Sequence, residues 1–246
     1  TNRRLNKTDA ALSAFRGATR IKADYTRAYI EIARLLTAKG DTDGAILNYT
    51  TALKHEPANV QALREMAAAY STRGDYQSAE RYFREALTLG SDDGRTNYNM
   101  ATVQLELGNN AQALDYAKKA VAAEPRNAVF LYTYGLAGER NKMSDVAVQQ
   151  YARAIAADPK YVKPRINLGI MYLEANRIED ALNQFTAAFT VESDNYEVNN
   201  NLGKVYGLRK EYNKAVEHFA RAVSKNPKDP TIVENLATAY TSAGLL

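Results

Sequence analysis

Small residues recur along this chain at a fixed spacing of 34 residues. Alanine forms two such series, seven residues apart: Ala45, Ala79, Ala113, Ala147, Ala181 and Ala215, then Ala52, Ala86, Ala120, Ala154, Ala188 and Ala222. Four residues after each alanine of the first series comes an aromatic residue, except at Ala117: Tyr49, Phe83, Tyr151, Phe185 and Phe219. Residues four and seven apart share one face of an α-helix. The pattern predicts one amphipathic helix in each 34-residue repeat.

A second pattern precedes each of these helices. A large residue is followed by a small one in every repeat: Ile32-Ala33, Met66-Ala67, Met100-Ala101, Tyr134-Gly135, Leu168-Gly169 and Leu202-Gly203. These positions share a face with apolar residues three and four places away. Each repeat is therefore predicted to be a pair of antiparallel amphipathic helices, with the small residues at points of close approach.

The ends of the helices are marked by glycine and proline. Gly40, Gly74 and Gly108 suit the left-handed turn that follows a first helix, and Lys142, Asn176 and Lys210 occupy the same place in the later repeats. Asparagine tolerates this conformation well, whereas the two lysines suggest a slightly different turn. Proline ends four of the second helices, and Ser91 and Ser193 replace it in the other two.

The spacing divides the chain without insertion or deletion. Six complete repeats are predicted at 26–59, 60–93, 94–127, 128–161, 162–195 and 196–229. Residues 1–25 match the second helix of a preceding repeat, because Ala11, Phe15 and Ala18 are in register with the later alanine and aromatic positions. Residues 230–246 match the first helix of a seventh repeat or a capping helix.

These features resemble the tetratricopeptide repeat family. The shared features are the 34-residue period, the Leu-Gly pairs, the two alanines, the following aromatic residue, and a tyrosine eleven residues into the repeat at Tyr70, Tyr172, Tyr206 and Tyr240. Gln104 and Gly138 depart from that tyrosine, and no tryptophan occurs. The resemblance covers nearly the whole chain. It implies an all-α, right-handed superhelical solenoid in which the first helices line a concave groove.

The composition narrows the range of functions. The absence of cysteine excludes disulfides, thiol nucleophiles and thiolate metal sites, and is compatible with a bacterial cell envelope or with cytoplasm. The net charge of +4 comes from residues 1–25, because the remaining residues hold 26 basic and 26 acidic side chains. We therefore expect no nucleic-acid partner. No apolar run is long enough to span a membrane, so membrane insertion is not expected.

The sequence proposes no catalytic site. The two histidines, His55 and His218, lie far apart in the chain, and no phosphate-binding loop or metal-ligand spacing is present. We therefore expect no enzyme activity and no cofactor. A protein-interaction scaffold is the favoured function. Two alternatives are a substrate-recruiting repeat arm of a larger, glycosyltransferase-like enzyme, and a self-assembly module that forms homo-oligomers through half-repeat ends.

The resemblance places groove-lining residues on the first helices, and the sixth position of each repeat stands out. It holds Glu31, Glu65, Asn99, Thr133, Asn167, Asn201 and, in the last partial repeat, Asn235. A carboxamide both donates and accepts, so a series of asparagines can pair with the backbone of an extended peptide whatever its side chains. The alternative is that these asparagines serve local hydrogen bonding within generic repeats.

Two further sets of first-helix residues are candidates for binding. An apolar floor is expected from Tyr98, Tyr132, Leu136, Ile166, Ile170 and Leu173, unless a helix shift turns some of them into core. The first repeats carry Arg27, Arg34, Arg64 and Arg95 beside two glutamates. This mixed-charge region can grip an acidic segment, or can consist of solvated pairs within a helix such as Arg27–Glu31. The two-carboxylate clamp pattern of chaperone-binding relatives is not satisfied in any three consecutive repeats.

Overall fold

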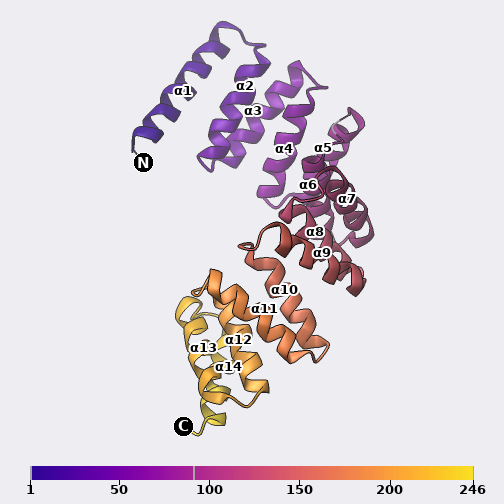
Figure 1. Cartoon of the computed structure of the whole chain (residues 1–246). Coiled ribbons are helices and arrows are strands. Elements are labelled where there is room, and N and C mark those ends of the chain that lie inside the picture. Colours follow the sequence, from indigo (N-terminus) through magenta and orange to yellow (C-terminus); the bar gives the residue numbers. More distant parts are fainter. Residues whose placement is uncertain (1, 91, 246) are drawn as a thin grey trace. The chain divides into compact units, whose positions relative to one another are not determined.

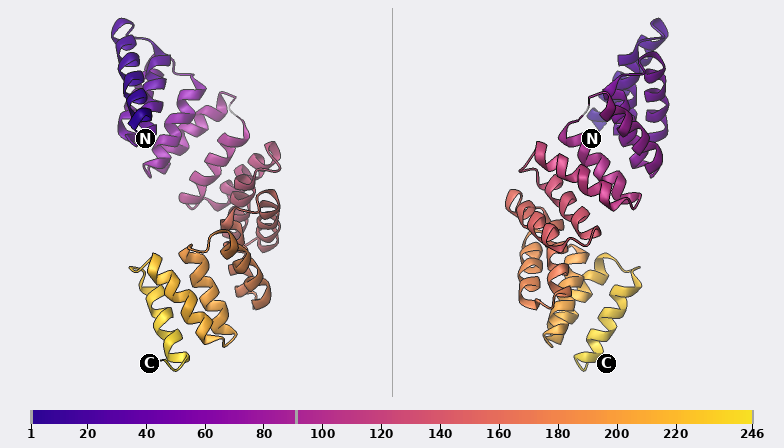
Figure 2. Two further views of the ribbon diagram at one scale, coloured as in Figure 1. Left: turned by 60° about the vertical axis from the view of Figure 1, so that its left-hand side comes forward. Right: turned by 90° about the vertical axis from the view of Figure 1, so that its right-hand side faces the viewer.

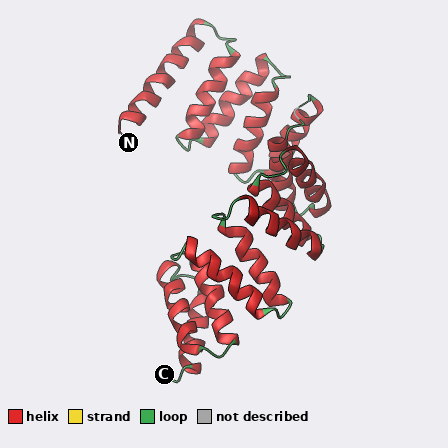
Figure 3. Ribbon diagram, in the orientation of Figure 1, coloured by secondary structure: helices red, strands yellow, loops and turns green. Residues whose placement is uncertain are grey.

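The chain is an all-α helical repeat solenoid in a computed structural model that describes residues 2–90 and 92–245, with side chains from residue 7 onward. The described residues form fourteen helices and no strand (Figures 1 and 3). The first seven helices are α1 (Asn2–Ile21), α2 (Thr26–Ala38), α3 (Thr42–His55), α4 (Val60–Thr72), α5 (Tyr76–Thr88), α6 (Gly94–Glu106) and α7 (Asn110–Ala123). The others are α8 (Ala128–Arg140), α9 (Ser144–Ala157), α10 (Val162–Glu174), α11 (Ile178–Val191), α12 (Tyr196–Leu208), α13 (Tyr212–Lys225) and α14 (Pro230–Ser242).

The chain divides into two compact parts, which we call the N-terminal half (residues 1–123) and the C-terminal half (residues 124–246). In each half every helix packs against the next one along the chain (Figure 2). Neighbouring first helices also contact each other. Helix α4 contacts α6, and helix α12 contacts both α10 and α14. The first helices of a half therefore lie side by side on one face. None of the described helices is both long and apolar enough to cross a membrane.

The recurring alanines form the centre of each helix pair. All twelve alanines of the two series are buried, with no exposed surface. The aromatic residue between them lies over the small residue of the preceding first helix. A Cβ added to Gly169 would come within 2.6 Å of the Phe185 ring, and one added to Gly203 within 2.7 Å of the Phe219 ring. Glycine is needed there because the ring occupies the space that a side chain would fill.

All six turns within repeats adopt the same left-handed conformation. The φ angle is +81° at Gly40 and +82° at Gly74, and +59° at Lys142 and +62° at Lys210. The expectation of a different turn at the two lysines is therefore wrong. The turn is fixed by backbone hydrogen bonds to the end of the first helix, such as Met143 N to Gly138 O at 2.9 Å, and the side chain adapts to it.

Ser91, the first of the two serines expected to replace a repeat-ending proline, lies outside the described residues. Before it, α5 ends at Thr88 and Gly90 takes a φ of +96°. A glycine in the left-handed conformation is a common end for a helix, so this repeat can end its second helix without proline. After it, the side chain of Asp93 caps α6 by accepting from Thr96 N at 2.8 Å.

Candidate functional site

A cavity of about 340 Å³ opens in the N-terminal half between α2, α3 and α4. Its lining includes Arg34 and Thr37 of α2, Tyr49 of α3, and Glu65 and Thr72 of α4. It therefore lies between two neighbouring first helices, with the aromatic residue of the intervening second helix at its base.

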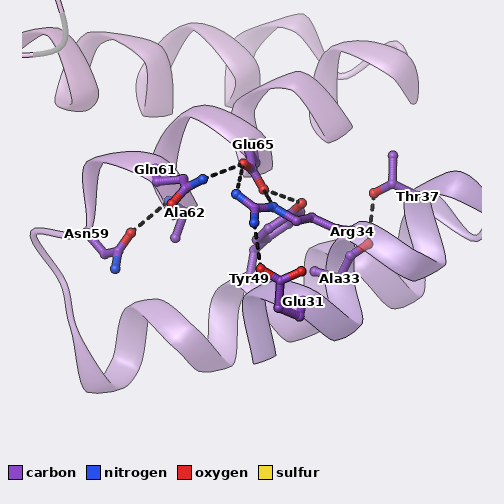
Figure 4. A network of polar contacts seen from close by, with 9 residues as sticks. All are labelled: Glu31, Ala33, Arg34, Thr37, Tyr49, Asn59, Gln61, Ala62 and Glu65. Carbon is purple, nitrogen blue, oxygen red and sulfur yellow. Dashed lines mark hydrogen bonds and ion pairs between the residues drawn. The ribbon is translucent and has the colours of Figure 1, made fainter. Parts of the chain in front are cut away.

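Polar side chains that contact one another form one wall of this cavity (Figure 4). The Arg34 guanidinium donates two hydrogen bonds to the Glu65 carboxylate, and the distance from Nε to Glu65 Oε2 is 2.7 Å. It also donates to Glu31 Oε1 at 2.7 Å. Tyr49 donates its phenol hydrogen to Glu65 Oε2 at 3.0 Å. Hydrogen bonding to Glu65 raises the pKa of Arg34, while burial and the Glu65 charge raise the pKa of Tyr49. Both groups therefore stay protonated, and Arg34 is neutralised within the protein.

A second cavity, of about 460 Å³, opens in the C-terminal half between α10, α12, α13 and α14. It lies at the same place in the repeat: Lys204 corresponds to Arg34, Phe219 to Tyr49, and Asn235 to Glu65. Its walls are mostly apolar and include Leu173 and Leu208. Leu208 is 60% exposed, which is a large exposed fraction for a leucine. We call the two sites the N-terminal cavity and the C-terminal cavity.

The residues at the sixth position of each repeat differ in how far they are available to a ligand. Thr133 and Asn201 are buried, with exposed fractions of 6% and 7%. Asn99 is half-buried, and the structure describes no hydrogen bond of its side chain. Asn167 donates to the phenol oxygen of Tyr151 at 3.0 Å.

Asn235 likewise has a partner inside the protein, since it donates to Asn200 Oδ1 at 3.1 Å. Five residues at the sixth position, Asn99, Thr133, Asn167, Asn201 and Asn235, were expected to line up as hydrogen-bonding groups for a peptide. Two of them are buried, and two others donate an N–H to a group within the protein. Asn99 is the one whose carboxamide is both partly exposed and without a described partner.

The expected apolar floor is divided between the halves and between core and surface. Tyr98 belongs to the N-terminal half, and the other five residues belong to the C-terminal half. Ile166 is 5% exposed and packs in the core with Val162 and Val198. Tyr132 lies against the rings of Tyr151 and Tyr161, with ring centroids 5.7 and 5.4 Å apart. Leu136 and Ile170 are half-buried.

The four arginines also occupy different environments. Arg64 forms an ion pair with Asp93 at 2.8 Å, and Arg34 lies in the network described above. Arg27 and Arg95 are exposed, and no ion pair is described for either. Glu31 pairs with Arg34 instead of Arg27. Arg34 thus joins Glu31 of its own helix to Glu65 of the next repeat, so the mixed-charge cluster contains pairs both within a helix and between repeats.

Sequence reasoning named Leu173 and Asn235, which line the C-terminal cavity, but it did not predict the cavity itself. The sequence feature that indicates this cavity is the residue at the twelfth position of each repeat. The six complete repeats hold Thr37, Ser71, Leu105, Glu139, Leu173 and Gly207 there. Gly207 alone lacks a side chain there, and no atom lies within 4 Å of the place where its Cβ would stand. The missing side chain leaves part of the cavity empty. Among the described residues, no group of three or more His, Asp or Glu is placed to hold a metal ion.

The family model for the tetratricopeptide repeat matches residues 30–94, 98–162 and 166–245. Residues of this chain are 29% identical over 66 positions to the general transcriptional corepressor trfA of Dictyostelium discoideum, which is 27% of this chain and 5% of that protein. The chain thus spans only a small part of this curated relative.

Solved structures show the same fold. YrrB, a TPR protein with an unusual peptide-binding site, is 25% identical, and the match has a TM-score of 0.65 over 75% of this chain and 95% of that one. PilF of Pseudomonas aeruginosa matches with a TM-score of 0.75 at 15% identity, over 87% of this chain and 97% of that one. At that identity the second likeness concerns the fold alone. Because the family model covers most of its length, this chain belongs to the tetratricopeptide repeat family and is a protein-interaction scaffold.

Proposed function

We propose that this scaffold binds an extended segment of a partner protein along the face formed by its first helices. The observation that carries the proposal is the recurrence of a cavity at the same place in the repeat, once in each half, between neighbouring first helices. A cavity between neighbouring first helices suits a side chain of an extended segment, whose backbone can lie along the same face.

The chemistry of this face also supports a peptide ligand. The half-buried carboxamide of Asn99 has donors and an acceptor that can pair with a peptide backbone. Lys204 and Leu208, both exposed, offer a charge and an apolar surface near each other. The likeness to YrrB, itself a protein with a peptide-binding site, points in the same direction.

Photo-crosslinking from defined positions tests this proposal. Benzoylphenylalanine would be placed at Thr72 or Thr238, which line the two cavities and are exposed. Matched control positions are Gln77 and Asn183, which are exposed on the second helices α5 and α11. Each variant is irradiated in lysate of the source organism, and the crosslinked proteins are identified by mass spectrometry.

We expect a protein partner to be crosslinked from a cavity position and not from the control positions. Crosslinking of the same partner from the second helices alone would overturn the groove proposal. Crosslinking to a second copy of this chain would instead support the self-assembly alternative, and a partner that is an enzyme subunit would support a recruiting role.

A further inference from the structure

The two cavities occupy the same register but differ in whether their cation is neutralised. In the N-terminal cavity Arg34 contacts the carboxylates of Glu31 and Glu65. In the C-terminal cavity the corresponding residues are Lys204 and Asn235, so the acidic partner is replaced by an amide. The structure describes no ion pair for Lys204. A charge that meets no carboxylate inside the protein is available to one from outside.

Two of the cations that follow Lys204 in the chain are paired with carboxylates inside the protein. Arg209 pairs with Glu179 at 3.1 Å and with Glu211 at 2.7 Å. Lys214 pairs with the same Glu211 at 2.6 Å. Lys204 is the one charged side chain among the described residues that line the cavity.

The apolar part of the cavity has the dimensions of a side-chain pocket. Its volume of about 460 Å³ lies in the range of natural ligand sites. Leu173, Leu208 and the Phe219 ring supply its apolar walls, and Gly207 leaves open the place where the other repeats have a side chain. Burying an apolar side chain against these walls would cover Leu208, which is 60% exposed.

The spacing of these features fits an extended peptide. Lys204, Gly207 and Leu208 share one face of α12, where residues three or four apart are roughly 5–6 Å from each other. In an extended chain, residues i and i+2 point to the same side and are separated by about 6.5 Å. An apolar residue over Gly207 therefore brings the residue two places away close to Lys204.

We propose that the C-terminal cavity is the specificity pocket of this scaffold, and that it takes an internal partner segment with an apolar side chain and an Asp or Glu two residues from it. The proposal rests on the function proposed above, and it adds the chemistry that the partner must have. The apolar side chain enters the cavity beside Gly207, and the carboxylate pairs with Lys204.

The test is a selection of random twelve-residue peptides on the whole chain, followed by fluorescence anisotropy with the selected peptides. The peptides are displayed within a carrier and then synthesised with amidated ends, so that no terminal carboxylate can act as the anion. Gly207→Leu fills the cavity and keeps the helix, because no atom lies near the added Cβ. Gly17→Leu is the matched control, since Gly17 is also helical with open space around it, in α1.

We expect the selected peptides to be enriched in an apolar residue with Asp or Glu two places away. Gly207→Leu should weaken their binding by roughly tenfold or more, as loss of a central anchor does, while Gly17→Leu leaves it unchanged. Lys204→Glu should reverse the charge preference, so that peptides with Lys in place of Asp or Glu bind better than the originals.

The outcomes separate this inference from the proposed function. Selected peptides that bind wild type and Gly207→Leu equally, or that show no apolar–acidic spacing, would overturn the specificity pocket but leave groove binding intact. Failure to select any peptide that binds the chain would count against the proposed function itself, and the pocket would fall with it.

Discussion

At the scale of single residues, the chain supplies a polar partner wherever it places a phenol in the core. Tyr49 and Tyr151 occupy an aromatic position that is phenylalanine in three other repeats. Tyr49 donates to Glu65, while Tyr151 donates to Glu139 Oε2 at 2.6 Å and accepts from Asn167. A buried hydroxyl without a partner would cost stability, so the neighbouring polar residues are structural in these repeats.

Replacing the phenol of Tyr151 tests this structural role. Tyr151→Phe fits the site, since Phe185 occupies the same position in the next repeat, and removes two hydrogen bonds. We expect a loss of about 1 kcal/mol in the free energy of unfolding, measured by urea denaturation. Asn167→Ala should cost less in the Tyr151→Phe background than in wild type, because the two residues share a bond. Tyr196→Phe, at an exposed tyrosine, is the control, and equal losses from both tyrosines would contradict the assignment.

Two glycines on α12 allow a matched test of close packing. An alanine Cβ at Gly203 would meet the Phe219 ring at 2.7 Å, whereas one at Gly207 would meet no atom within 4 Å. Gly203→Ala should therefore destabilise the protein by about 1–3 kcal/mol through overpacking. Gly207→Ala should stabilise it by up to about 1 kcal/mol, because alanine favours the helix. Melting temperatures of the two variants check the sign of each effect, and a shift in the same direction would refute the packing argument.

The limits of sequence reasoning are clearest at this scale. The repeat predicted which alanines would be buried, because their spacing fixes the face of the helix on which they lie. It did not separate the buried Asn201 and Thr133 from the half-buried Asn99, because burial at the sixth position depends on small rotations of each helix. Nor did it predict the pair of Arg34 with Glu65, because these residues are 31 positions apart and meet only through packing of α2 beside α4.

At the scale of elements, the turns within repeats show the backbone overriding the side chain. Lys142 and Lys210 adopt the left-handed conformation that glycine favours, with the same hydrogen-bonded turn as Gly74. For residues other than glycine this conformation costs roughly 1 kcal/mol. The structure of each helix pair therefore compensates for a locally unfavourable residue.

The cost can be recovered by substitution. Lys210→Gly should stabilise the protein by up to about 1 kcal/mol, because it relieves the left-handed strain in the turn between α12 and α13. Gly74→Lys should destabilise it by a similar amount for the same reason. Urea denaturation at constant salt measures both, with Lys228→Gly at an exposed position outside the helices as a control. If Lys210→Gly lowers stability, the side chain rather than the backbone dominates this turn.

The helix α13 carries a group whose charge depends on pH. His218 stacks on Tyr206, with ring centroids 5.4 Å apart, and contacts Phe189 edge-on at 5.3 Å. Its Nδ1 lies 3.0 Å from Asn199 Oδ1. Burial lowers the pKa of His218, and the nearby charge of Arg221 adds to this lowering while Glu217 opposes it. The folded protein therefore favours neutral imidazole.

This direction fixes the sign of a stability change with pH. The stabilisation is fully present above the unfolded-state pKa of about 6.5, and is lost as the pH falls through the lower folded-state pKa. Urea denaturation at pH 8 and pH 5 should show a larger loss of stability on acidification for wild type than for His218→Phe, which keeps the ring but does not titrate. The same loss in both proteins would show that other groups control the acid response.

At the scale of the whole molecule, the repeat determines the fold and the departures from it determine the site. The 34-residue period predicted the helix pairs, because a strict period with alanine at two helix–helix contacts leaves few other arrangements. The C-terminal cavity arises where Gly207 lacks the side chain that the other complete repeats carry at the twelfth position, and Asn235 lines it where the N-terminal cavity has Glu65. Such a site is not visible in the consensus of the repeats, and becomes visible only when the packed neighbours of each departure are known.

The linear arrangement also predicts how a local defect spreads. Described helices contact mainly their neighbours along the chain, so stability is approximately a sum of repeat and nearest-neighbour terms. Phe185 of α11 has no exposed surface, and Phe185→Ala should cost about 3–5 kcal/mol locally. Amide hydrogen exchange should then show lower protection in α10 to α13, and nearly unchanged protection in α2 to α4. An equal loss of protection in all helices would mean that the chain unfolds as one cooperative unit, and that occupation of the C-terminal cavity would stabilise the N-terminal half as strongly as its own.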